Sequence, residues 1–235
     1  LTSTPIAVSN SRNPKFVIAA NDANGIDQLE CQLGSGAYEA CSASHSYNNL
    51  QDGDQVFRAR ARDRAGNLST PVSYNWKIDT SKPVVTITAG PERWIRVRNA
   101  SVSFAANDTN VASGLPALRI ECRLNNGNFA NCTSPAAYTG LNEGSYLFAV
   151  RAIDAAGNIS DEASLTWGVD MTAPSINFGR QPLSLIYIGE QAEVFFTAAD
   201  SGTNASGLAT VMCGLVGSLS PCTPEALRQY MSATA

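Results

Sequence analysis

The stretch at residues 144–158, GSYLFAVRAIDAAGN, predicts a long β-strand that ends in a tight turn. Apolar side chains alternate from Tyr146 to Ala152, which is the period of a strand with one buried face. Asp154 and Gly157 then take the first and fourth positions of a turn, where a type I turn favours Asp and Gly. The stretch therefore indicates an antiparallel β-fold.

The same design recurs with a period of 91 residues. Residues 53–67, GDQVFRARARDRAGN, precede the first stretch by this distance (144 − 53 = 91). Further residues share the period: Cys31, Cys122 and Cys213; Cys41 and Cys132; Tyr47 and Tyr138; Trp76 and Trp167; Asp79 and Asp170. Solenoid repeats have periods of about 20–50 residues, so a period this long indicates a folded module.

The repeat divides the chain into three predicted domains. Aligning Pro5 with Pro91 places each of them 17 residues before an Asp, Asp22 and Asp108 (22 − 5 = 17; 108 − 91 = 17). We predict a first repeat that lacks only its first few residues, a complete second repeat, and a third repeat that is incomplete at its C-terminus. Their bounds are 1–82, 83–173 and 174–235.

Each repeat has the pattern of an all-β domain. In the second repeat, about seven short segments with strand character are separated by turn residues every ~8–12 positions. We find no convincing amphipathic helix. The sequence therefore predicts tandem antiparallel β-sandwiches of about seven strands each.

The six cysteines fall two to a repeat, at similar short spacings. Zinc would need four nitrogen or sulfur ligands in each copy, and the only histidine, His45, has no counterpart in the other repeats. Disulfides within each repeat, formed in an oxidising compartment, are the favoured interpretation, and buried free thiols are the alternative. The expected pairs are Cys31–Cys41, Cys122–Cys132 and Cys213–Cys222.

The composition excludes several classes of function. A net charge of −4 and a pI near 5.0 argue against nucleic-acid binding, which needs a basic face. No stretch approaches the ~20 apolar residues that cross a bilayer, so no direct membrane insertion is expected. The sequence has no initiating Met and no signal peptide, and any export signal is expected outside it.

The order of motifs resembles that of a bacterial extracellular immunoglobulin-like repeat, related in architecture to fibronectin III and cadherin-like modules. The matching residues are Tyr47, Leu50, Gly53, Asp63, Gly66, Asn67, Trp76, Asp79 and Pro83, and Tyr138, Leu141, Gly144, Asp154, Gly157, Asn158, Trp167, Asp170 and Pro174. The resemblance implies a long surface adhesin, stalk or filament. One departure is that the paired cysteines are expected on neighbouring strands, whereas antibody domains bridge their two sheets.

The third repeat stops 13 residues after Cys222 (235 − 222 = 13) and so lacks its later strands. Half a sandwich would expose its core face to water. Two explanations are open. The sequence is a window on a longer chain, or strands of a neighbouring subunit complete the repeat, as in donor-strand polymers.

Carboxylates near the predicted linkers are candidate calcium ligands, because Ca²⁺ prefers hard oxygen ligands. In related adhesin arrays, calcium at the linkers stiffens the rod. The alternative is turn chemistry, in which an Asp hydrogen-bonds its own backbone. The candidates are Asp22 and Asp108 after the second strand, Asp63 and Asp154 in turns, and Asp79 and Asp170 before the linkers.

Two stretches are candidate partner-binding surfaces. Arg58, Arg60 and Arg62 lie on one strand face, which could bind an acidic partner or form a solvated face that resists aggregation. The second repeat lacks most of this stripe. Trp94 lies among cations in the segment 92–98, and it predicts either a contact with another domain or subunit or ordinary packing.

The sequence does not indicate an enzyme. We see no Ser or Cys nucleophile with a histidine fixed by the repeat, no phosphate-binding glycine loop and no cluster of metal ligands. We expect no resident cofactor beyond calcium at the linkers. The favoured function is an extracellular or cell-surface structural and adhesive stalk, with neighbouring repeats of a longer chain, other subunits, or a surface glycan or protein as partners. The alternatives are a glycan- or protein-binding module and an accessory array of a secreted enzyme.

Overall fold

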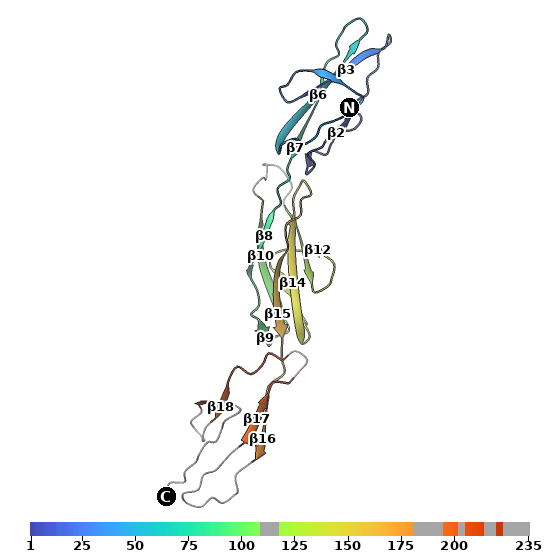
Figure 1. Ribbon diagram of the computed structural model, residues 1–235. Coiled ribbons are helices and arrows are strands. Elements are labelled where there is room, and N and C mark those ends of the chain that lie inside the picture. The colour runs from blue at the N-terminus through green and yellow to red at the C-terminus, as the bar shows by residue number, and fades with distance from the viewer. Residues whose placement is uncertain (109–117, 181–194, 202–204, 214–219, 223–235) are drawn as a thin grey trace, which may run out of the picture. The chain divides into compact units, whose positions relative to one another are not determined.

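A computed structural model describes residues 1–108, 118–180, 195–201, 205–213 and 220–222 (Figure 1). These residues form strands and turns, and none of them belongs to a helix long and apolar enough to cross a membrane. The chain divides into two compact units, and the second repeat contributes to both of them. The units are Leu1–Thr88 with Phe104–Ser134 and Ala149–Ser164, and Ala89–Ser103 with Pro135–Phe148 and Leu165–Ala235. The predicted domain boundaries stay predictions from the repeat.

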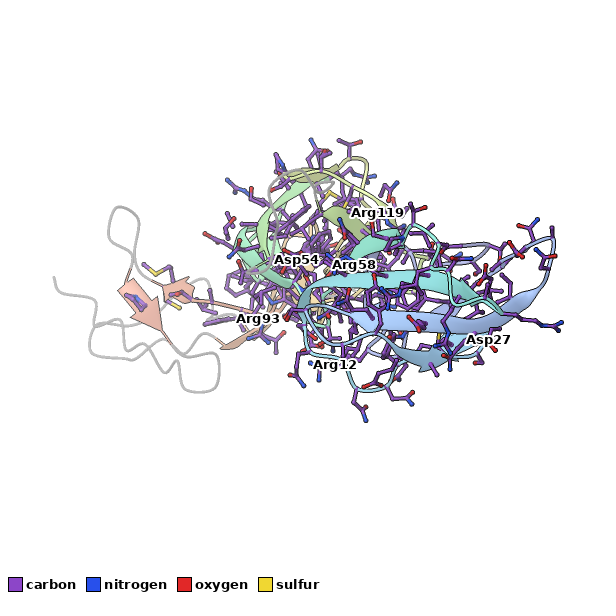
Figure 2. The ribbon with its side chains drawn as sticks, turned by 90° about the horizontal axis from the view of Figure 1, so that it is seen from above. Arg12, Asp27, Asp54, Arg58, Arg93 and Arg119 are labelled. Carbon is purple, nitrogen blue, oxygen red and sulfur yellow. A yellow bond between two sulfur atoms is a disulfide. The ribbon has the colours of Figure 1, made fainter. Side chains whose placement is uncertain are left out.

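The first repeat forms a five-stranded sheet and a two-stranded sheet. In the larger sheet the order is β1 (Val8–Ser9), β7 (Val72–Ile78), β6 (Gly53–Asp63), β3 (Ile26–Leu33) and β4 (Glu39–Cys41). The smaller sheet pairs β2 (Lys15–Val17) with β5 (Ser44–Ser46). Figure 2 labels side chains of the larger sheet, Asp27 of β3 and Asp54 and Arg58 of β6.

The second repeat has the same strand order with one strand more. Its larger sheet runs β12 (Ala130–Asn131), β11 (Arg119–Leu124), β14 (Gly144–Ile153), β15 (Ala163–Val169) and β9 (Trp94–Ile95). Its smaller sheet runs β13 (Ala136–Tyr138), β10 (Ala100–Asn107) and β8 (Val84–Ala89). The long alternating stretch that opened the sequence analysis is β14, which lies beside β15 (Figure 1).

Strand register confirms the alignment of the first two repeats. Val8 of β1 pairs in parallel with Lys77, and Trp94 of β9 pairs in parallel with Gly168. Trp94 follows Val8 by 86 residues, and Gly168 follows Lys77 by 91 residues (94 − 8 = 86; 168 − 77 = 91). The alignment at Pro5 has the same offset (91 − 5 = 86). The five extra residues therefore fall between β10 and β11, where 109–117 lie outside the described residues.

The third repeat is described in two strand pairs. β16 (Ser175–Arg180) pairs with β17 (Phe195–Ala199), and β18 (Val211–Cys213) pairs with β19 (Ser220–Cys222). Both pairs are antiparallel, as in the first two repeats. The fold is thus a tandem array of immunoglobulin-like β-sandwich repeats.

An aromatic core joins the two sheets of the first repeat. Phe16 of β2 stacks on Phe57 of β6 with ring centroids 3.9 Å apart, and Trp76 of β7 packs edge-on against Phe16 at 5.3 Å. Phe16 and Phe57 are fully buried, and Trp76 is 3% exposed. The alternating pattern of β6 contributes to this core because Phe57, Ala59 and Ala61, two residues apart, are all buried on one face.

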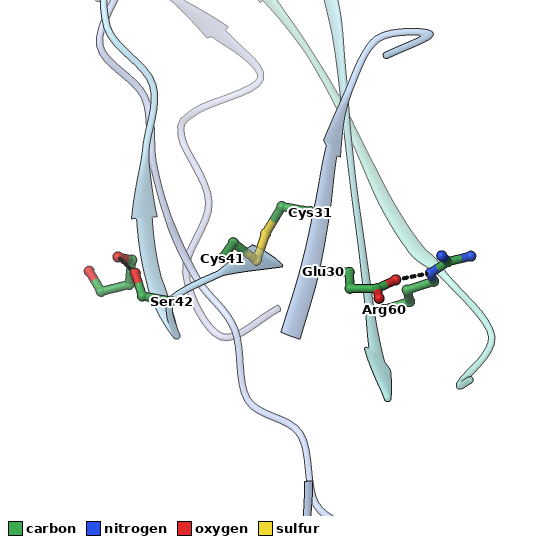
Figure 3. The surroundings of a disulfide bond; sticks show 6 residues. Glu30, Cys31, Cys41, Ser42 and Arg60 are labelled. Atoms are coloured by element: carbon green, nitrogen blue, oxygen red, sulfur yellow. Dashed lines mark hydrogen bonds and ion pairs between the residues drawn. A yellow bond between two sulfur atoms is a disulfide. The ribbon is translucent and has the colours of Figure 1, made fainter. Parts of the chain in front are cut away.

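The disulfides link neighbouring strands of one sheet, as the sequence predicts. Cys31 of β3 bonds to Cys41 of β4, and Cys122 of β11 bonds to Cys132 just after β12, with Cα atoms 5.7 and 5.8 Å apart. Figure 3 shows Cys31 pointing toward Cys41, while the adjacent Glu30 points away toward Arg60. Cys213 is also disulfide-bonded. The side chain of Cys222, its expected partner, lies outside the described residues.

Removing the Phe57 ring should destabilise the first repeat. We expect Phe57→Ala to lower the free energy of unfolding by about 3–5 kcal/mol, because it leaves a cavity beside Phe16. Urea unfolding followed by tryptophan fluorescence measures it, since Trp76 lies in the same core. Phe178→Ala is the matched control, because Phe178 is 60% exposed. Equal losses in the two variants would contradict this account of the core.

Candidate functional site

The Asp-x-x-Gly-Asn motif closes the turn between β6 and β7. The main-chain carbonyl of Asp63 accepts from Gly66 N–H at 3.1 Å, and its carboxylate accepts from Asn67 N–H and Nδ2–H, both at 2.8 Å. Gly66 adopts φ +92°, a conformation that favours glycine. These bonds to the charged form lower the pKa of Asp63, with the Asn67 side chain as the largest cause.

The second copy of this turn makes one further contact. Asn158 donates from its N–H and Nδ2–H to the two carboxylate oxygens of Asp154, both at 2.8 Å. Its Nδ2 group also donates to the main-chain carbonyl of Asp79 at 2.8 Å. Asp79 directly follows β7, the last strand of the first repeat, so Asn158 connects the turn of the second repeat to the end of the first. Both residues belong to the first compact unit.

Three carboxylates converge at this junction. One oxygen each from Asp79, Asp108 and Asp154 lie within 4.8 Å of one another. Asp79 is 3% exposed, and its carboxylate accepts the N–H of Ser81 at 3.0 Å. Three negative charges this close repel one another, and burial of Asp79 adds a desolvation cost. The cluster is therefore an arrangement that a bound cation would stabilise.

The junction brings together three of the six predicted calcium ligands. Asp22 instead accepts the N–H of Asn24 at 2.8 Å, and Asp63 closes its turn. By the repeat, Asp22 and Asp63 correspond to Asp108 and Asp154. A complete cluster of three carboxylates thus combines one Asp from the end of a repeat with two Asp residues from the repeat that follows.

Asp170, the counterpart of Asp79, lies in a second carboxylate pair within the other compact unit. Asp170 accepts the N–H of Ser206 at 2.7 Å and that of Thr172 at 3.1 Å. The Ser206 bond is the largest cause that lowers the pKa of Asp170. Ser206 Oγ–H also donates to Asp200 at 3.3 Å. Asp200 Oδ1 is buried without a hydrogen-bond partner among the described residues.

The arginine stripe of β6 is held by its own sheet. Arg58 donates to the carbonyl of Gly34 at 2.9 Å, and Arg60 forms an ion pair with Glu30 at 2.7 Å (Figure 3). Arg62 forms an ion pair with Asp27 at 3.0 Å. The stripe is thus a ladder across β3 and β6 on the solvent face. Whether an acidic partner binds this face stays a prediction.

A charged cluster that sequence reasoning missed occurs in both repeats. The guanidinium of Arg60 lies 4.0 Å from the ring centroid of Tyr38, while Arg60 pairs with Glu30. In the second repeat the guanidinium of Arg151 lies 4.1 Å from the ring centroid of Phe129. Arg151 also forms an ion pair at 2.7 Å with Glu121, which is 7% exposed. All three positions keep the 91-residue period, which is the signal that could have found them: Glu30 and Glu121, Tyr38 and Phe129, Arg60 and Arg151.

Trp94, the fourth candidate for partner binding, lies on β9 at the edge of the larger sheet of the second repeat. It lines a cavity together with Glu92, Arg96 and Asp170. The arginine stripe and Trp94 therefore occupy different repeats, and they belong to different compact units.

No family model matches the sequence, and no curated protein matches it. Among solved structures, the fibronectin(III)-like modules of CbhA from Clostridium thermocellum are 17% identical, covering 71% of this chain and 93% of theirs, with a TM-score of 0.45. The FN1–FN3 domains of chicken CNTN1 are 10% identical over 71% of this chain and 66% of theirs, with a TM-score of 0.38. The D00–D0 domain of Intimin is 14% identical. The match covers 68% of this chain and 95% of the Intimin chain, with a TM-score of 0.30.

These similarities are too low to carry an argument by themselves, and the fold assignment rests on the strand order and register. That order defines immunoglobulin-like, fibronectin III-like modules in tandem. Such modules are typically non-catalytic. Their particular role is a separate question, because one sandwich fold hosts many functions.

Acid should weaken the turn that Asp63 closes. A lowered pKa in the folded state means that this carboxylate stabilises the fold above its ordinary pKa of 3.8, and that the contribution is lost as the pH falls through the folded value. We expect the melting temperature of the natural protein to fall more steeply below pH 3.8 than that of Asp63→Asn, which keeps an acceptor but cannot titrate. Calorimetric melts across the acid range measure both curves. Parallel curves would exclude the effect.

Proposed function

We propose that the chain is a segment of an extracellular structural and adhesive array, in which the repeats hold a binding end or a partner at a distance. The observation that carries this proposal is the contact between Asn158 and the carbonyl of Asp79, which fastens one repeat to the next. An exposed ion pair between Lys82 and Asp161 at 2.9 Å spans the same junction. Two repeats that hydrogen-bond to each other resist bending more than two repeats that only a flexible linker connects.

The disulfides support a location outside the cytosol. Disulfides persist in secreted and surface proteins and are rare where thiols are kept reduced. Each bond closes a short loop within one sheet, so it stabilises a single repeat and leaves the connection between repeats unchanged. A module that a disulfide stabilises suits a chain that functions outside the cytosol, in an oxidising compartment.

The junction carboxylates are the proposed calcium ligands of the array. Asp79, Asp108 and Asp154 supply hard oxygen atoms of the kind that Ca²⁺ binds, and a bound ion would relieve their mutual repulsion. Ca²⁺ takes about 6–8 oxygen ligands, so main-chain carbonyls and water would complete the set. The ion would connect the last strand of one repeat to two loops of the next and would stiffen the junction.

A second candidate function is a module that itself recognises a glycan or a protein. The cavity beside Trp94 favours this function, because it gathers aromatic, acidic and basic groups at one place. The two functions are compatible, since a stiff array can carry binding sites along its length.

The junction bond can be tested by changing one amide. We expect Asn158→Ala to increase bending between the first two repeats, seen in small-angle scattering as a broader distribution of end-to-end distances. Asn67→Ala is the matched control, because Asn67 closes the same turn in the first repeat. Equal scattering from Asn158→Ala and the natural protein would contradict the proposed role of this contact.

Calcium binding has an independent test. We expect Ca²⁺ at 100 times its dissociation constant to stabilise the natural protein by about 2.7 kcal/mol, measured as a higher melting temperature. Asp108→Asn should abolish the shift, whereas Asp22→Asn should keep it, because Asp22 is the corresponding residue outside the cluster. A melting temperature that neither calcium nor chelator changes would exclude the metal and would leave the array proposal standing.

A further inference from the structure

Trp94 packs against a glycine on the outer face of a sheet. Trp167 and Val169 of β15 are buried in the core, so Gly168 between them faces the opposite side of the sheet. A Cβ atom on Gly168 would lie 2.0 Å from Cζ3 of Trp94, which means that the indole occupies the space a side chain would fill. Gly168 is consequently buried although it lies on the outer face.

The first repeat lacks this pair. At the corresponding positions the first repeat has Val8 and Lys77, which pair in the same register. A large residue thus replaces a small one on β9, and a glycine replaces a lysine on β15. Ordinary packing needs neither change, because the first repeat builds the same sheet without them. The exchange places an aromatic ring on the outer surface.

The ring borders a cavity of about 430 Å³, within the range of small-ligand sites. The cavity lies within one compact unit, and its walls combine apolar, acidic, basic and hydroxyl groups. The residues that line it include Glu92, Trp94, Arg96, Val97, Asp170 and Ser206.

Several of these groups make no hydrogen bond or ion pair with the residues that the structure describes. Within the described part of the chain, the side chains of Glu92 and Arg96 make no ion pair or hydrogen bond, and both residues are exposed. The indole N–H of Trp94 likewise donates to no described acceptor. Asp170 differs, because the N–H groups of Ser206 and Thr172 fix its carboxylate. The cavity therefore offers an aromatic face, a fixed carboxylate, and further donors and acceptors that are open to a ligand.

We propose that this cavity binds a neutral saccharide. The C–H faces of a pyranose ring stack on an aromatic ring, and its hydroxyl groups both donate and accept hydrogen bonds. The cavity matches this mixture, with Trp94 as the platform, Glu92 and Asp170 as acceptors and Arg96 as a donor. The lining itself holds two carboxylates and one guanidinium, with Arg93 and Arg98 of the same segment outside it, so the charge of the lining does not favour an anionic polysaccharide. This proposal rests on the second candidate function, recognition by the cavity beside Trp94, and names its ligand class, while the structural role of the junction between repeats does not depend on it.

Intrinsic fluorescence reports on the site selectively. Of the three tryptophans, Trp76 and Trp167 are 3% and 2% exposed, so Trp94 is the indole that a ligand can reach. We would titrate the full chain with cellotetraose, N-acetylchitotetraose and mannotriose, and with heparin and a lysine-rich peptide as charged comparisons. We expect at least one neutral saccharide to change the emission, and Trp94→Phe to remove that change.

Variants at the polar wall complete the test. We expect Glu92→Gln combined with Arg96→Gln to weaken saccharide binding about tenfold, because each loses a charged hydrogen-bonding group. Arg93→Gln is the matched control, since Arg93 is an exposed neighbour outside the cavity lining. Isothermal titration of the same variants checks binding without relying on Trp94, and unchanged melting temperatures show that they fold.

Three outcomes would overturn the proposal. The first is that no neutral saccharide in the panel binds at millimolar concentration. The second is that only heparin or the lysine-rich peptide binds, which would assign the cavity to a charged partner. The third is that a saccharide binds but the Glu92 and Arg96 variants bind it as tightly as the natural protein does, which would place the site elsewhere.

Discussion

The turn in which one Asp accepts hydrogen bonds from the Asn four residues later is the constraint on which much of this structure depends. It ends the longest strand of each of the first two repeats and sets where the returning strand begins. The return strand then brings Trp76 or Trp167 into the core. In the second repeat the same Asn holds the carbonyl of Asp79, so a local motif also becomes a joint between repeats.

The joint also explains why carboxylates gather there. Asp79 lies at the end of one repeat, and Asp108 and Asp154 lie in loops of the next, so the cluster draws its carboxylates from both repeats. Asp154 therefore has two roles, because its oxygens close the turn and one of them faces the other carboxylates. Mechanical connection and cation binding would depend on the same few atoms.

Repetition and variation separate structure from recognition in this chain. The Glu–Arg–aromatic cluster beside the disulfide is present in both repeats, as expected of a feature that supports the fold. The Trp94–Gly168 pair occurs in the second repeat and not in the first, whose sheet forms without it. A feature that the fold does not require is the better candidate for a ligand site.

The sequence by itself determined the all-β repeats, the strand that became β14 and the cysteine pairs confirmed at Cys31–Cys41 and Cys122–Cys132. These follow from alternation and short spacing, which act within one repeat. Only the tertiary structure decided which carboxylates meet, because Asp79 and Asp154 are 75 residues apart (154 − 79 = 75). It also decided that Arg60 pairs with Glu30, and that Trp94 covers Gly168 on the outer face of the sheet. Contacts between distant segments depend on sheet register and on the junction, and a linear pattern of residue types does not encode either directly.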